Sequence, residues 1–144
     1  MPDRFHLERF VTAQEAVYPQ VLDELHAGSK RGHWIWFIFP QMKGLGHSSQ
    51  ANFYGIGSLE EAVAYLRHPV LGPRLGRCAR LVALVEGRAI REILGSPDDL
   101  KFRSSMTLFA RAAEEAGAAP TDFNDALAKY FNGDPDPLTL ALLR

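Results

Sequence analysis

Six side chains, divided between two stretches of the chain, have the chemistry to bind a small polar molecule. The first stretch spans residues 33–46 and the second spans residues 96–107. In chain order the candidates are His33, Trp36, Gln41, Asp98, Asp99 and Lys101. Together they offer an aromatic face, an amide, an imidazole, two carboxylates and an ammonium group. A pocket would form where the two stretches meet, and the sequence alone does not fix their mutual position.

The aromatic face belongs to an unusual run at residues 34–39, which holds both tryptophans and two phenylalanines. Such a run could form the wall of a site for a planar ligand, since stacking contributes about 1–3 kcal/mol per base. It could equally be protein core, where burying one aromatic side chain contributes about 1.5–3 kcal/mol. It is too short to cross a membrane, which takes about 20 residues. We expect a buried helix or extended segment, with one edge of Trp36 in a pocket.

Gln41 directly follows Pro40, which ends the aromatic run, and it precedes two glycines, Gly44 and Gly46. A primary amide donates and accepts hydrogen bonds together, so it can recognise a base, an amide or a ribose. Glycine lets the backbone approach a ligand closely. The alternative is structural: Gln41 caps a neighbouring helix and the glycines only turn the chain.

Charged residues gather at a predicted helix start, Ser96-Pro97-Asp98-Asp99. Asp98 or Asp99 could act as a general base or bind hydroxyl groups, and Lys101 could meet an anion. The structural alternative is that Ser96 caps the helix and the acids lie at its positive end. The chain has no recognisable cofactor motif, so hydrolysis with an aspartate base is the simplest chemistry if the protein is an enzyme. The sequence leaves that question open.

Composition argues against several other classes of protein. The net charge of −1 and the pI of about 6.5 do not favour nucleic acid or membrane partners. Lys30, Arg31 and Lys43 flank the aromatic run but are few. The five histidines lack metal-site spacing, so we expect no metal. Cys78 is the only cysteine, which excludes an internal disulfide, and we read it as buried. We expect a cytoplasmic protein.

Periodicity and helix signals predict one compact all-α domain over residues 1–144, with seven to eight short helices around the buried aromatic segment. Pro19 divides the first helical pattern in two. Ser58 and Glu61 form a capping box, and Thr121 or Asp122 caps a later helix. The predicted helices lie near 4–13, 16–27, 58–67, 73–86, 89–94, 97–116 (with a possible break at Arg103-Ser104), 121–131 and 138–143.

Several stretches of the chain resemble a bacterial family catalogued as domain of unknown function 1810. They are Leu7–Val11, Lys30–Gln41, Gly44–Gly46, His68–Leu75 and Gly95–Phe109. The resemblance extends over nearly the whole length and implies a multihelical fold in a bacterial cytosol. It implies no reaction, ligand or functional residue.

Three hypotheses of function follow. The first is a protein that binds, and could hydrolyse, a small polar or nucleotide-like molecule between segments 33–46 and 96–107. The second is a protein-interaction or self-association module without catalysis, which would show an exposed apolar patch. The third is a structural domain whose polar groups are all satisfied internally.

Overall fold

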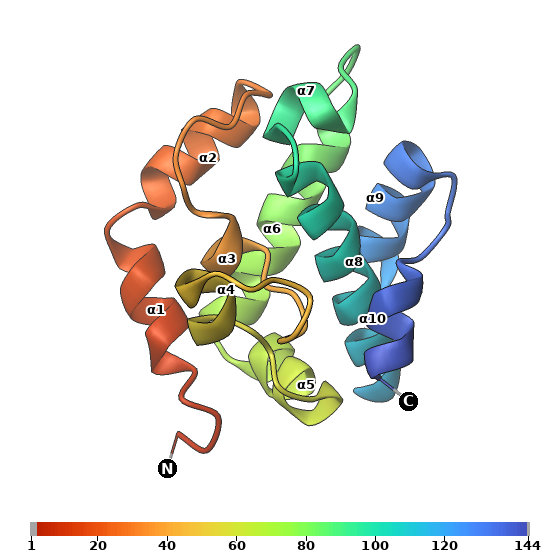
Figure 1. Cartoon of the computed structure of the whole chain (residues 1–144). Coiled ribbons are helices and arrows are strands. Elements are labelled where there is room, and N and C mark those ends of the chain that lie inside the picture. Colours follow the sequence, from red (N-terminus) through yellow and green to blue (C-terminus); the bar gives the residue numbers. More distant parts are fainter. Residues whose placement is uncertain (1–2, 144) are drawn as a thin grey trace.

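The computed structural model describes residues 3–143, and every regular element in that range is a helix (Figure 1). An isolated bridge between Met42 and Ile56 is the nearest approach to a strand there. The all-α prediction is confirmed, but the ten helices exceed the seven to eight predicted. They are α1 (Glu8–Glu15), α2 (Tyr18–His26), α3 (Ile35–Ile38), α4 (Ser49–Phe53), α5 (Leu59–Arg67), α6 (Leu71–Leu84), α7 (Ile90–Leu94), α8 (Asp98–Glu115), α9 (Thr121–Phe131) and α10 (Pro137–Leu142).

Helix α8 is the central element, and it contacts α3, α5, α7, α9 and α10. Figure 1 shows it running through the molecule with α9 and α10 on one side and α3 on the other. The predicted break at Arg103-Ser104 is wrong, because α8 continues through it. The Ser104 hydroxyl donates to the Leu100 carbonyl at 3.2 Å, a bond that leaves the helix intact. The second segment of candidate residues therefore lies on one rigid helix.

The capping box before α5 is half confirmed. The Ser58 hydroxyl accepts a hydrogen bond from the Glu61 N–H at 3.1 Å, as predicted. The Glu61 carboxylate does not accept a hydrogen bond from the Ser58 N–H, which a complete capping box requires. It accepts from the Gly57 N–H at 3.0 Å and from the Arg9 guanidinium at 2.8 Å. The acid therefore ties α1 to α5.

Two predicted caps are wrong. Pro97, and not Ser96, precedes the first turn of α8, and no side chain caps that turn. Pro120 precedes α9 in the same way, so neither Thr121 nor Asp122 caps it. In both helices the proline takes the N-cap position, and the neighbouring acid still lies in the first turn, near the positive end of the helix.

The aromatic run forms α3, a single helical turn packed into the core. Trp34, Ile35, Ile38 and Phe39 are buried, as the core interpretation predicts. Trp36 is only partly buried. Helix α4 is not among the predicted helices, and it begins where the Ser48 hydroxyl accepts from the Ala51 N–H at 3.0 Å. Within residues 3–143, no helix is both long and apolar enough to cross a bilayer.

Candidate functional site

The two segments that hold the candidate residues lie side by side. The rings of Phe39 and Phe102 pack edge to face, with their centroids 4.8 Å apart. The ammonium group of Lys101 lies 5.3 Å from the centroid of the Trp36 ring. The single turn of α3 and the residue after it, Phe39, therefore pack on the first two turns of α8. The sequence could propose this meeting but could not establish it.

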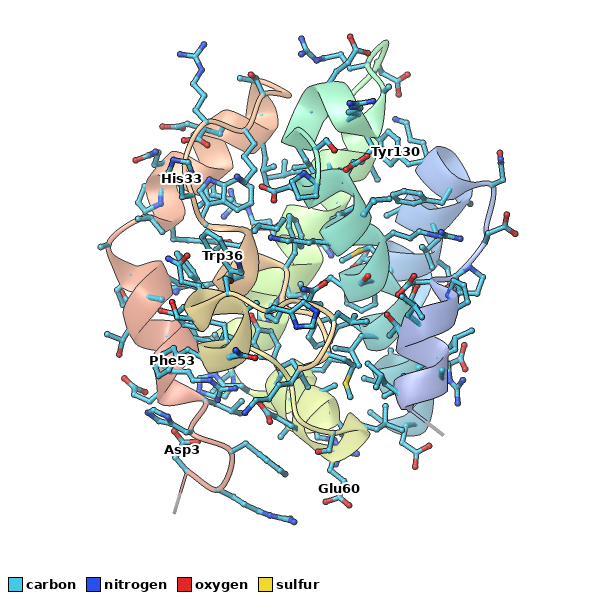
Figure 2. The ribbon with its side chains drawn as sticks, viewed as in Figure 1. Asp3, His33, Trp36, Phe53, Glu60 and Tyr130 are labelled. Atoms are coloured by element: carbon cyan, nitrogen blue, oxygen red, sulfur yellow. The ribbon has the colours of Figure 1, made fainter. Side chains whose placement is uncertain are left out.

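Trp36 differs from its neighbour Trp34 in how its indole N–H is used. The Trp34 N–H donates to the carboxylate of Glu24 at 3.0 Å inside the core. The Trp36 Nε1 atom is also buried, but no residue within 3–143 accepts a hydrogen bond from it. A buried donor without a partner costs about 1–3 kcal/mol, so such a group in a native protein needs an explanation. Figure 2 shows Trp36 on α3, with His33 nearer α2.

A small hollow adjoins Trp36, and we name it the Trp36 hollow. Its lining residues are Trp36, Gln41, Ala51, Tyr54 and Gly55. Its volume of about 10 Å³ is near the lower limit for one water molecule, so it can receive a single polar atom. The side chain of Gln41 makes no hydrogen bond to the residues in 3–143, so it does not cap a helix there. The residues that line the hollow thus include one with an indole, one with an amide and one with a phenol.

The backbone around the hollow explains the glycines that follow Gln41. The carbonyl of Gln41 accepts from the Ile56 N–H at 2.9 Å, which fixes the two ends of the connecting loop together. Gly44 turns the chain with a φ of 103°, a conformation that favours glycine. A Cβ atom at Gly46 would lie 2.7 Å from the Ala51 Cβ. Gly46 therefore lets α4 pack close to Gln41.

A cluster of three charges lies beside Trp36, and we name it the Lys101 cluster: Lys30, Asp98 and Lys101. The Lys30 ammonium group lies 2.8 Å from the Asp98 carboxylate, and the Lys101 ammonium group lies 3.9 Å from it. The side chain of Lys30 is only 7% exposed, and it also donates to the Gly32 carbonyl at 2.6 Å. Asp98 therefore forms its closer ion pair with Lys30, and Lys101 is the more distant cation.

Two candidate residues lie apart from these groups. Asp99 and Lys101 are two residues apart on α8, which places them about 200° apart around the helix axis. The Oδ1 atom of Asp99 is buried without a partner among residues 3–143. His33 is exposed, and no hydrogen bond joins it to that part of the chain. The hollow that Gln41 lines includes neither Asp98 nor Asp99. The roles of these residues stay predictions.

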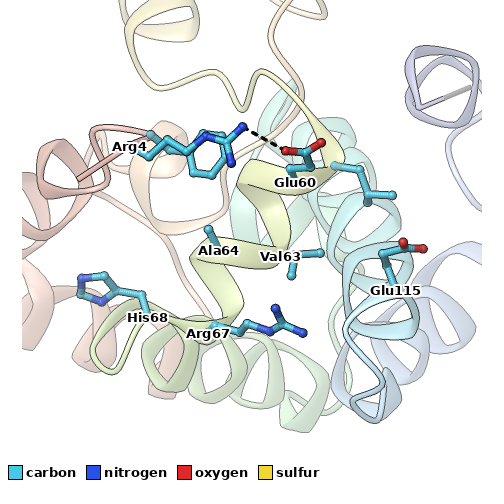
Figure 3. Close-up of a pocket in the computed structure, with 9 residues that line it drawn as sticks. Arg4, Glu60, Val63, Ala64, Arg67, His68 and Glu115 are labelled. Atoms are coloured by element: carbon cyan, nitrogen blue, oxygen red, sulfur yellow. Dashed lines mark hydrogen bonds and ion pairs between the residues drawn. The ribbon is translucent and has the colours of Figure 1, made fainter. Parts of the chain in front are cut away.

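A larger groove lies elsewhere, between the N-terminal segment and α5 (Figure 3). Its volume is about 990 Å³, and its lining includes the apolar side chains of Phe5, Val63 and Ala64. The Arg4 guanidinium lies 3.3 Å from the Glu60 carboxylate, and Arg67, His68 and Glu115 also line the groove. None of the six candidate residues lies in this region. Its charges are of both signs and show no preference for one ligand.

Other reactive groups are built into the core. Cys78 is completely buried, and burial raises the pKa of its thiol to about 12, which rules out a thiolate at neutral pH. Between residues 3 and 143 no three His, Cys, Asp or Glu side chains gather as a metal site would require.

Two residues of the site, Tyr54 and Lys30, were not among the six candidates drawn from the sequence. Both depend on tertiary contacts that no local motif signals.

Comparison with known proteins identifies relatives of this chain, and the descriptions of those relatives name no activity. A family model described as "Protein of unknown function (DUF1810)" matches residues 4–143. The fold is similar to that of a conserved hypothetical protein of Mycobacterium tuberculosis solved by crystallography. That protein is 59% identical, the alignment covers 98% of both chains, and the TM-score is 0.93. None of the curated proteins compared matches the chain.

Proposed function

The chain belongs to the family described as "Protein of unknown function (DUF1810)", and from its geometry we propose that it binds a small, planar polar molecule of nucleotide type at the Trp36 hollow. One observation carries the proposal: the indole N–H of Trp36 is buried without a partner in residues 3–143, and it belongs to a residue that lines the hollow. A ligand acceptor atom in the hollow would satisfy that donor.

The hollow is an anchor for one atom, and the rest of the ligand lies outside it. The rings of Trp36 and Tyr54 are each partly exposed and offer the apolar surface against which a planar ring can stack. The amide of Gln41 supplies one donor and one acceptor at the same place. A flat molecule with a polar edge matches this combination better than an aliphatic one does.

We propose that the site binds its ligand and carries out no reaction on it. Asp98, one of the two aspartates that could act as a base, is held by Lys30 in an ion pair of 2.8 Å. Its carboxylate therefore positions lysines beside the site. The single buried cysteine favours a reducing compartment, the cytoplasm, as the place where the protein meets its ligand.

The interaction-module hypothesis expects the aromatic run to pack against a partner or a second copy of the chain. Four residues of that run, Trp34, Ile35, Ile38 and Phe39, are buried in the core. Another surface for a partner is the groove between the N-terminal segment and α5, whose lining has apolar side chains but charges of both signs. This hypothesis stays a prediction. A size-exclusion profile that shifts to smaller size on dilution would favour it.

A thermal-shift screen against nucleobases, nucleosides, nucleotides and ADP-ribose derivatives tests the binding proposal. A ligand at 100 times its dissociation constant adds about 2.7 kcal/mol of stability. For a domain of this size the midpoint should rise by about 5–15 °C. Flat curves throughout the screen would contradict the proposal.

Two variants localise a hit, and one serves as a control. Trp36→Phe keeps a ring but removes the N–H, and Gln41→Ala removes the amide. Each should weaken binding by about tenfold, the effect of losing one hydrogen bond of about 1.4 kcal/mol. Gln50→Ala changes an exposed glutamine of α4 outside the hollow and should leave binding unchanged. Equal affinity in all four proteins would place the ligand elsewhere.

A further inference from the structure

We propose that the ligand carries an anionic group, a phosphate or a carboxylate, and that Lys101 binds it. This inference rests on the proposed function, because it concerns the same site. It adds the charge of the ligand and names the residue that selects it.

The Lys101 cluster contains two cations and one anion. Lys30 lies at hydrogen-bonding distance from Asp98, 2.8 Å, whereas Lys101 lies 3.9 Å away, beyond the usual limit of about 3.2 Å. Lys30 is nearly buried, so the pair it forms with Asp98 is shielded from water. The charge of Asp98 is therefore compensated mainly by Lys30. One positive charge, that of Lys101, is left over.

Lys101 is also accessible and close to the proposed binding face. Its side chain is 25% exposed, and its ammonium group makes no hydrogen bond to a residue in 3–143. It lies 5.3 Å from the centroid of the Trp36 ring. An ammonium group has three donors, so an anionic substituent on a ring stacked at Trp36 could accept hydrogen bonds from it.

The other acidic residue nearby in sequence does not cancel the charge of Lys101. Asp99 lies about 200° around α8 from Lys101, so the two side chains leave nearly opposite sides of the helix. Gln41 and Tyr54, which line the hollow, add an amide and a hydroxyl group and no carboxylate. The face that Trp36 and Lys101 share is therefore positive.

Two matched pairs of probes test the inference on the unmodified protein: adenosine with adenosine 5′-monophosphate, and nicotinamide with nicotinate. Isothermal titration calorimetry should give at least tenfold tighter binding for the anionic member of a pair. The preference should shrink when salt is raised from 0.05 to 0.5 M, since ions screen a partly exposed charge. The pair that shows the larger preference distinguishes phosphate from carboxylate.

Lys101→Gln should remove that preference, so that the neutral and the anionic member of a pair bind with similar affinity. Arg111→Gln, which removes an exposed charge ten residues further along α8, serves as the control and should keep the preference. Equal binding of neutral and anionic probes, or a preference that survives in Lys101→Gln, would overturn the inference and leave the proposed function standing. If no probe of either kind binds, both fail together.

Discussion

Glu24 anchors the chain segment that leads into α3, and its removal should destabilise the protein in a pH-dependent way. Its carboxylate accepts hydrogen bonds from the backbone N–H groups of Arg31 at 2.7 Å and Gly32 at 2.9 Å. It also accepts from Trp34 Nε1 at 3.0 Å and Gln20 Nε2 at 2.7 Å. Four donors on one buried carboxylate strongly favour its ionised form.

The magnitude follows from the pKa of Glu24. Burial alone would raise this pKa, but the hydrogen bonds from Gly32, Arg31, Gln20 and Trp34 outweigh burial and lower it from 4.5 to about 2. At 1.36 kcal/mol per pH unit, this corresponds to about 3 kcal/mol of stability at neutral pH. Because the folded-state pKa is lowered, the contribution is complete above pH 4.5 and is lost as the pH falls toward 2.

Glu24→Gln removes the charge and keeps the shape of the side chain. We expect the free energy of unfolding in urea, followed by tryptophan fluorescence, to fall by about 3 kcal/mol at pH 7 and by about 1 kcal/mol at pH 3. Glu15→Gln is the control: its side chain is 61% exposed, so we expect a change below about 0.5 kcal/mol. An equal loss at both pH values in Glu24→Gln would refute the reasoning.

Two further predictions concern the core. Arg9→Met should lower the free energy of unfolding in urea by about 3–5 kcal/mol, because it leaves the Glu61 carboxylate buried and uncompensated. Arg4→Ala is the control: the ion pair of Arg4 is exposed to solvent, so its loss should cost less than about 1 kcal/mol. Similar losses in the two variants would contradict this account. The Cys78 thiol should react with a thiol reagent at pH 8 at least about 100-fold more slowly in the native protein than in urea, since it is buried with a pKa of about 12. Rapid reaction of the folded protein would show that the thiol is accessible.

The sequence predicted well those features that depend on neighbouring residues. The all-α class, the position of α5 after Ser58 and the burial of Trp34 all follow from periodicity, capping and hydrophobicity. It failed at the start of α8, where Pro97 displaced Ser96 as N-cap. A cap depends on the local path of the backbone, which the residue types alone do not fix.

The candidate site was predictable only in part, because its geometry is tertiary. The contact between Trp36 and Lys101 could not be predicted from the sequence, because residue chemistry does not fix how segments 33–46 and 96–107 lie in space. The division of Asp98 and Asp99 between two faces of α8 follows once the helix is known. The commitment of Asp98 to Lys30, 68 positions away in the sequence, has no local signal. The position of Tyr54 in the lining of the Trp36 hollow has no local sequence signal either.

The indole N–H signals in a ¹⁵N–¹H correlation spectrum provide the most direct test of the proposed site. The chain has only two tryptophans, so two such signals are expected, and Trp36→Phe assigns them. Saturating adenosine or adenosine 5′-monophosphate should shift the Trp36 signal, while the Trp34 signal, already bonded to Glu24, stays in place. An unchanged Trp36 signal in the presence of a ligand that stabilises the protein would contradict the account.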